Sequence, residues 1–297
     1  MKSQCLYLLL CLCVFFPVSS KDLYFRHIDL NEDFTQPSAI SIYQDAQGLV
    51  WFGNDNLNVY DGRVVRSFRL SSYLEEVEDN NIHGICGDGH SYVYMLADKK
   101  LIVFDKQAEA FRPAGVEAQA LEYHDGVLYY AAQNRVFRYI SEGVKEMVCI
   151  LPDPAVVIKD LFWEGDVCWM ATTHGVYHYN GNTFQVMLEN ESATSLFMDH
   201  LKRLWVGTLS NGVKMLDRDR WVSWQENDPA RSLVNNQVRT ISQDDKGNIW
   251  IGTYDGITIV SASLDDCYHL LHKEQVSWSL KHSSVYAIYK DNQGGMW

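Results

Sequence analysis

Residues that would signal an enzyme or a metalloprotein are missing or scattered in this sequence. It contains no C-x-x-C pair and no H-E-x-x-H, G-x-S-x-G or Walker motif. The histidines nearest to expected turns and strands have no motif partner, and they are His83, His90, His124, His174 and His178. We therefore assign no catalytic residue, no metal ligand and no cofactor.

Positive charge is also scarce. The sequence has 25 Lys and Arg against 38 Asp and Glu, which gives a formal net charge of −13. Binding to nucleic acid requires clustered cations that neutralise phosphates, and attraction to an anionic membrane surface requires them as well. Neither is an expected partner of this segment.

The first residues have the pattern of a secretory signal. Lys2 supplies a positive start, Leu6–Val18 is apolar, and Ser19 and Ser20 are small residues before an expected cleavage near Lys21. The apolar run is shorter than the roughly 20 residues that a spanning helix needs. We expect residues 1–20 to be a signal peptide and residues 21–297 to form one exported, periplasmic domain.

Cysteines outside the expected signal are few and far apart, at Cys86, Cys149, Cys168 and Cys267. This spacing indicates neither a zinc site nor a dense disulfide framework. One or two bridges are compatible with an oxidising compartment. Buried free thiols, which behave as small hydrophobes, are the alternative.

A repeated pattern is what the sequence does contain. The stretch QDDKGNIWIGTYDGITIV (Gln243–Val260) has an Asp-x-x-Gly turn, an aromatic strand ending in Gly, a second turn and a second apolar strand. Related stretches start at Asp45 and Asp199, and weaker ones include Gly87–Asp105, Tyr123–Tyr139 and Trp163–Gly181. A seventh begins at AIYKDNQGGMW. The aromatic anchors are Trp51, Tyr94, Tyr129, Trp169, Trp205, Trp250 and Trp297.

These anchors recur at roughly 35 to 47 residues, the period of a four-stranded propeller blade. In one copy we expect strands at Val238–Gln243, Asn248–Thr253 and Ile257–Val260, with Gly247 in the first turn. Apart from a turn at Tyr73–Glu78, there is no helical periodicity. The residues expected to pack adjacent blades together are Trp51, Trp169, Trp205, Trp250, Gly53, Gly207 and Gly252. The fold class is an all-β propeller of six to seven blades, with the last one truncated.

The aspartates of the first turn could be read as calcium ligands. They are Asp45, Asp199, Asp244 and Asp291. A calcium loop of that type needs about six oxygen ligands and a downstream bidentate Glu. Here an aromatic strand follows at once, so the hairpin-turn interpretation is favoured over a metal.

The segment NNQVRTISQDDKGNIWIGTYDGI, from Asn235 onward, resembles the repeat of the two-component regulator propellers. The copies at Trp51 and Trp205 resemble it too. The resemblance implies the periplasmic sensor region of a hybrid two-component histidine kinase from glycan-foraging bacteria. Its kinase, receiver and membrane helix would lie outside this chain, so we expect a fragment of an inner-membrane-anchored protein and carry over no phosphotransfer residue.

The expected function is extracytoplasmic ligand sensing and signal transduction, with an oligosaccharide or another small extracellular molecule as the ligand. We also expect control of a kinase outside the chain, and a homodimer in the full-length protein. In a propeller, the loop entering the innermost strand and the turn between strands two and three share one face. That face would carry the ligand-binding residues Gln237, Arg239, Tyr254, Asp255, Asn54, Asp55, His174, Asn211 and Tyr286. Two alternatives stay open: a propeller enzyme, of polysaccharide lyase, hydrolase or quinoprotein type, and a protein-docking scaffold.

Overall fold

The computed structural model describes residues 23, 25–28, 38–72, 74, 81–274, 276 and 279–297. The expected signal peptide at residues 1–20 and most of the expected turn at Tyr73–Glu78 lie outside these ranges. Strands dominate the described residues, and the sole helical element among them is the short 3-10 turn η1 (Leu70–Ser72). Within the same ranges, no helix has the length and apolar character of a membrane span.

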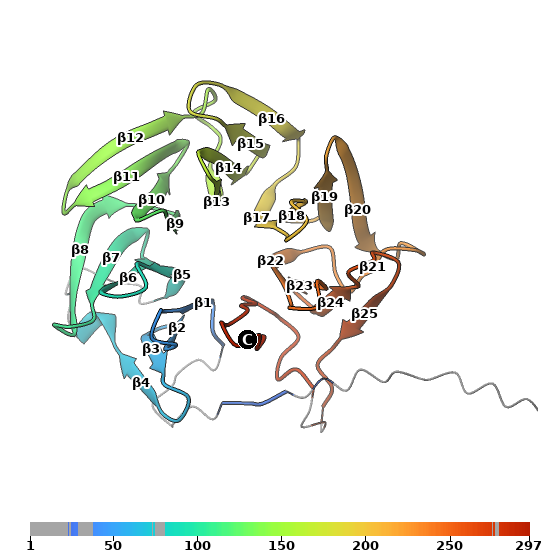
Figure 1. The fold of residues 1–297 in the computed structure, drawn as a ribbon, viewed down its shortest axis with the longest axis horizontal. Helices are drawn as coiled ribbons and strands as arrows, with labels where there is room; N and C mark the ends of the chain where they lie inside the picture. The colour runs from blue at the N-terminus through green and yellow to red at the C-terminus, as the bar shows by residue number, and fades with distance from the viewer. Residues whose placement is uncertain are drawn as a thin grey trace, which may run out of the picture.

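Six consecutive antiparallel sheets form the blades of a ring (Figure 1). Blade one contains β1 (Ser41–Gln44), β2 (Val50–Gly53), β3 (Leu57–Tyr60) and β4 (Val65–Phe68), and blade two contains β5 (Ile82–Gly87), β6 (Tyr92–Ala97), β7 (Lys100–Asp105) and β8 (Ala110–Glu117). Blade three contains β9 (Ala120–His124), β10 (Val127–Ala132), β11 (Arg135–Ser141) and β12 (Val144–Ile150), and blade four contains β13 (Ile158–Glu164), β14 (Val167–Thr172), β15 (Gly175–Tyr179) and β16 (Phe184–Glu189).

Blade five contains β17 (Ala193–Met198), β18 (Leu204–Thr208), β19 (Val213–Asp217), β20 (Arg220–Glu226) and the short parallel addition β21 (Ser232–Leu233). Blade six contains β22 (Val238–Gln243), β23 (Ile249–Thr253), β24 (Gly256–Val260) and β25 (Cys267–Leu270). In every blade the strands pair in chain order, and the first strand lies nearest the centre of the ring (Figure 1). The three strands expected around Trp250 are therefore confirmed.

Large apolar side chains pack between the sheets. Trp51, Trp205 and Trp250 are buried in three different core clusters. Trp169 is buried as well, in a cluster that joins blade four to blade five. Because a sheet with two apolar faces cannot shield both by itself, each blade depends on its neighbours for burial.

Glycines in the second strands let neighbouring blades approach each other. A Cβ added at Gly53 would lie 2.7 Å from the Cβ of Ile82 in the next blade. At Gly207 it would lie 2.8 Å from the Cγ1 of Val238. Both separations are below any normal carbon contact, so these positions admit no side chain without a shift.

A seventh repeat follows blade six and is partial. Tyr289 and Trp297 exchange two backbone hydrogen bonds, with N···O distances of 3.2 and 2.8 Å. The backbone N–H of Asn292 donates to Gln44 Oε1 of blade one at 2.8 Å, just as His200 N–H of blade five donates to Gln243 Oε1 of blade six at 3.0 Å. The hairpin of residues 289–297 thus meets blade one as a complete blade meets its successor, which agrees with the expected truncated last blade.

All four described cysteines are free thiols. Cys149 and Cys168 are buried in one core cluster between blades three and four. The structure therefore supports the free-thiol alternative rather than bridges.

Candidate functional site

The aspartates of the first turn organise the hairpin that follows them. Asp244 Oδ1 accepts the backbone N–H groups of Lys246 and Asn248, both at 2.9 Å. Its Oδ2 accepts the side-chain N–H of Asn248 at 2.8 Å and the indole N–H of Trp250 at 3.0 Å. One carboxylate therefore closes the turn and fixes the orientation of the buried tryptophan.

The same Asp–Trp bond recurs in three other repeats. It measures 2.9 Å in the Asp45–Trp51 and Asp199–Trp205 pairs and 2.7 Å in the Asp291–Trp297 pair. Because these carboxylate oxygens already accept protein N–H donors, they have little capacity left for a cation. Within the described residues, no group of three or more His, Cys, Asp or Glu is placed to hold a metal ion.

Hydrogen bonding lowers the pKa of Asp199, Asp244 and Asp291. Burial alone would raise the pKa of Asp199, but hydrogen bonds from Trp205 and Arg203 outweigh it and hold the pKa below the ordinary value of 3.8. Asp244 and Asp291 show the same balance, with burial opposed by the donors of Asn248, Trp250 and Trp297, and a lowered pKa as the result. Ionised carboxylates therefore hold these three turns.

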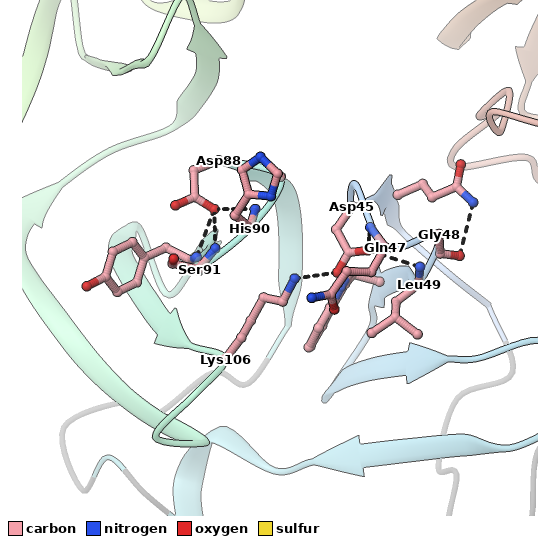
Figure 2. A network of polar contacts seen from close by, with 12 residues as sticks. Asp45, Gln47, Gly48, Leu49, Asp88, His90, Ser91 and Lys106 are labelled. Carbon is pink, nitrogen blue, oxygen red and sulfur yellow. Dashed lines mark hydrogen bonds and ion pairs between the residues drawn. The ribbon is translucent and has the colours of Figure 1, made fainter.

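Asp45 also joins two blades. Lys106 Nζ, at the end of blade two's third strand, lies 2.6 Å from Asp45 Oδ2, and both side chains are largely buried (Figure 2). Next to it, Asp88 Oδ1 accepts the backbone N–H groups of His90, Ser91 and Tyr92. This face of the ring is therefore occupied by structural turns.

Two inner strands carry buried carboxyl groups. Burial raises the pKa of Glu122 on β9 to about 8, against the lowering effect of a hydrogen bond from the Trp163 backbone. Burial likewise raises the pKa of Asp160 on β13 to about 6, although its carboxylate accepts the backbone N–H groups of Leu196 at 2.8 Å and Leu161 at 2.9 Å. These groups lie at blade contacts, and sequence reasoning missed them because their strands carry no motif.

The opposite face carries the expected ligand-binding residues. In blade six the backbone N–H of Tyr254, in the turn between β23 and β24, donates to the carbonyl of Gln237 in the loop entering β22 at 3.2 Å. Blade five repeats this contact between Leu209 and Ser192 at 2.9 Å. The two types of loop therefore emerge together, as the sequence indicated.

Arg239 is the centre of the most connected group on this face. Its guanidinium carbon lies 5.2 Å from the ring centroid of Tyr254 and 4.3 Å from that of Tyr286. The three residues come from β22, from the turn between β23 and β24, and from the start of the seventh repeat. Arg239 is half-buried, whereas Tyr254 is 47% exposed. A cation held between two aromatic rings has little freedom to move away.

Polar groups surround this Arg–Tyr cluster. Asn235 Nδ2 donates to Asp255 Oδ2 at 2.9 Å, and Asn235 Oδ1 accepts the Gln237 backbone N–H at 2.8 Å. Ser284 Oγ donates to the Tyr254 carbonyl at 3.0 Å. Sequence reasoning missed Asn235 and Ser284 as parts of this group, although Asn235 belongs to the repeat that it singled out. We call Asn235, Gln237, Arg239, Tyr254, Asp255, Ser284 and Tyr286 the blade-six rim.

The other expected residues lie in the corresponding turns of other blades. Asn211 Nδ2 donates to Glu191 at 2.8 Å, and Glu191 lies 3.3 Å from Lys214 Nζ. The exposed ring of His174 lies 2.9 Å from the Thr173 hydroxyl. Asp55 is half-buried in the turn between β2 and β3. No hydrogen bond or ring contact found among the described residues links these side chains to Arg239.

Asn54 is a correction to the expected set. It is 1% exposed, and its Oδ1 accepts the Asn56 backbone N–H at 2.9 Å and the Asn58 side chain at 3.0 Å. A buried amide with these partners shapes the turn and presents nothing to a ligand. Asparagine is common both in turns and in ligand-binding sites, so the sequence alone could not distinguish these two roles for Asn54.

Comparison with known proteins agrees with this architecture. The family model described as two component regulator propeller matches residues 232–255, which contain most of the blade-six rim. No curated protein sequence matches the chain.

Among solved structures, the extracellular domain of a one component system from B. thetaiotaomicron has a TM-score of 0.76 and 19% identity, over 92% of this chain and 38% of that one. The extracellular domain of a hybrid two component system from B. thetaiotaomicron has a TM-score of 0.68 and 16% identity, over 88% of this chain and 38% of that one. A streptogramin B lyase has a TM-score of 0.71 and 11% identity, over 89% of this chain and 91% of the lyase.

These identities show a shared fold. The chain spans about two fifths of the first two structures and nearly the whole of the lyase. The sequence repeat adds more specific information because it matches one named family. The chain is therefore a β-propeller that carries a two-component regulator propeller repeat at residues 232–255.

Proposed function

We propose that this propeller is the extracytoplasmic, periplasmic sensor domain of a hybrid two-component signalling protein, that it binds an oligosaccharide at the blade-six rim, and that binding controls a histidine kinase elsewhere in a dimeric protein. The repeat at residues 232–255 and the likeness to extracellular domains of such systems support the signalling class. The residues of the blade-six rim support an oligosaccharide as the ligand.

The observation that carries the proposal is the position of Arg239 between Tyr254 and Tyr286. An exposed aromatic ring leaves apolar surface in water, and here the ring is also held in place by a cation. Such an arrangement offers a flat apolar face and directed donors at the same point. A sugar ring, which has C–H faces and hydroxyl edges, fits that combination.

The polar neighbours match the edges of a sugar. Asp255 accepts hydrogen bonds, Arg239 donates them, and the amide of Gln237 does both. The Asn235 bond to Asp255 fixes one of these groups before a ligand arrives. A small-molecule site characteristically combines apolar surface with a few oriented polar groups.

The position of the blade-six rim suggests how ligand binding could produce a signal. Its residues come from blade six and from the segment that begins the seventh repeat, so one ligand would contact both. A ligand changes a conformational equilibrium only if it binds one state better than the other. Contact with two separate segments is one way to obtain such a difference.

The test is calorimetric titration of the propeller with defined neutral and acidic oligosaccharides. We expect one class to bind and the double variant Arg239→Ala, Tyr254→Ala to lose that binding. The matched control is Arg112→Ala, because Arg112 lies 5.2 Å from the Tyr92 ring centroid away from the rim. Binding that the double variant retains unchanged, or that the control also loses, would exclude the blade-six rim.

A further inference from the structure

The innermost strands of four blades each contain an extra residue at the same position. In blade six, the pairing of β22 with β23 skips Arg239. The same irregularity skips His83 in β5, Lys159 in β13 and Thr194 in β17. A β-bulge of this kind takes its side chain out of the regular alternation of the strand, and bulges are common beside binding sites. We call His83, Lys159, Thr194 and Arg239 the inner bulge residues.

The inner bulge residues lie on one face of the ring, around its centre. The first strand of every blade is the one nearest the centre (Figure 1), and each bulge is the second residue of its strand. The loops that enter these strands emerge on the face that carries the blade-six rim. The four bulges therefore surround the centre of the ring on the same face as the rim.

These positions carry positive charge in an acidic protein. The formal net charge of the chain is −13, yet two of the four bulge residues are Lys159 and Arg239, and none is Asp or Glu. His83 and Lys159 are both exposed. The hydroxyl of Thr194 donates to the Val238 carbonyl of the next blade at 2.8 Å, so Thr194 serves the contact between blades. The cations on the two neighbouring blades remain for a ligand.

Arg239 differs from the other partly buried cations because it has no counter-ion. Among the described residues, five Lys or Arg residues are buried or half-buried, and four of them pair with a carboxylate. The four are Lys100, Lys106, Arg203 and Lys214. Arg239 forms no ion pair with a described carboxylate, and Asp255 of the rim is bonded to Asn235 instead. A half-buried charge that lacks a partner has lost hydration without compensation, and an anionic ligand would supply it.

We propose that the inner bulge residues select an acidic oligosaccharide, with one anionic group bound at Arg239 and a second at Lys159. The inference rests on the proposed function and narrows its ligand to chains that carry carboxylate or sulfate groups. Guanidinium N–H groups bind such oxygens at two points, whereas the lysine ammonium acts as a point charge. Blade five lies between the two cations, so the ligand extends across the start of β17.

Matched pairs of oligosaccharides test this selection by charge. Oligomers of uronic acids and sulfated oligosaccharides are titrated calorimetrically into the chain, beside carboxyl-reduced or desulfated counterparts that keep the same rings and linkages. We expect acidic members to bind and their neutral counterparts to bind at least roughly tenfold more weakly, because a lost hydrogen bond to a charged group costs about a factor of ten in affinity. Affinity for the acidic members should also fall as the salt concentration rises.

Lys159 provides the sharpest variant, because its exposed side chain makes no contribution to the core. Lys159→Ala should weaken binding of the acidic ligand roughly tenfold and reduce its dependence on salt, whereas Lys159→Arg should retain both. The matched control is Lys246→Ala, which removes an exposed lysine from the Asp244 turn on the opposite face. It should leave binding unchanged.

Three outcomes would count against the inference. Neutral oligosaccharides that bind as tightly as their acidic counterparts, and lose binding in Arg239→Ala, would overturn it and leave the proposed oligosaccharide sensor standing. Equal affinities for Lys159→Ala and Lys246→Ala would overturn it as well. Absence of binding by every oligosaccharide in the series would reject the proposed function, and the inference with it.

Discussion

Replacing Asp199 by Ala removes a turn carboxylate that is fully buried and accepts hydrogen bonds at both oxygens. Its Oδ1 accepts the backbone N–H groups of Leu201 and Arg203, both at 2.9 Å. Its Oδ2 accepts Arg203 Nε–H at 2.6 Å and the Trp205 indole N–H at 2.9 Å. The Asp199 side chain is 0% exposed and that of Arg203 is 9% exposed, so water cannot replace the lost partner without a rearrangement.

The loss of stability can be worked out from these contacts. Removing one member of a buried ion pair costs about 3–5 kcal/mol, since the other charge stays buried. An unsatisfied buried N–H costs about 1–3 kcal/mol. These terms overlap because the same rearrangement relieves both, and we expect Asp199→Ala to lower the free energy of unfolding by about 4 kcal/mol. That is a large part of the roughly 5–15 kcal/mol that holds a domain folded.

The assay is urea denaturation followed by tryptophan fluorescence. Asp61→Ala is the matched control, since Asp61 also closes a turn, with bonds of 2.8 and 2.7 Å to the N–H groups of Arg63 and Val64, but lies exposed. Its loss should lower the free energy of unfolding far less than the loss of Asp199, because water replaces the lost acceptor. The double variant Asp199→Ala, Arg203→Ala should cost less than the sum of the two single variants. Equal losses for Asp199→Ala and Asp61→Ala would refute the reasoning.

Further predictions concern the pH dependence of stability and the packing between blades. The pKa values of Asp199, Asp244 and Asp291 are lowered in the folded state, so the stability that they contribute is present above the ordinary pKa of 3.8 and is lost as pH falls below it. Glu122 has the opposite effect on stability, because its folded pKa of about 8 lies above the ordinary 4.5, and stability therefore falls as pH rises between these values. Chemical denaturation at several pH values measures this dependence. Glu122→Gln should flatten the dependence of stability on pH, whereas the exposed control Glu117→Gln should leave it unchanged. Trp250→Ala should lower the free energy of unfolding by about 3–5 kcal/mol, and Gly252→Ala by about 1–3 kcal/mol, because an added Cβ would lie 2.6 Å from Thr240 Cγ2. Variants that unfold at the wild-type denaturant concentration would contradict the interblade packing.

The fold was predictable because each blade contains its own local signals. In blade six, Asp244 closes the expected turn, Gly247 has the expected positive φ, and the Trp250 ring is buried as expected. Blades two and three have Tyr94 and Tyr129 at the anchor positions and still form four-stranded sheets. The repeat period and the alternation of strands were therefore sufficient to predict these blades, even though their motif is weak.

The site was only partly predictable, because its geometry depends on contacts between repeats. The sequence indicated that Arg239 and Tyr254 share a face, but the closer contact of Arg239 with the Tyr286 ring depends on how the seventh repeat leaves blade six. Asn54 shows the converse. Its residue type suits ligand binding, but the structure shows that it is buried and hydrogen-bonded to Asn56 and Asn58. The raised pKa of Glu122 also arises from burial between blades, which no local pattern reports.

Hydrogen–deuterium exchange of the propeller with and without the oligosaccharide that binds in the calorimetric titration is the most direct test of the proposed ligand site. We expect bound ligand to slow exchange in segments 235–239, 254–256 and 284–286, because these segments form the blade-six rim. The Asp turns of the opposite face, at residues 45–49 and 88–92, should exchange at unchanged rates. Protection confined to that opposite face, with none at Arg239 and Tyr254, would contradict the account.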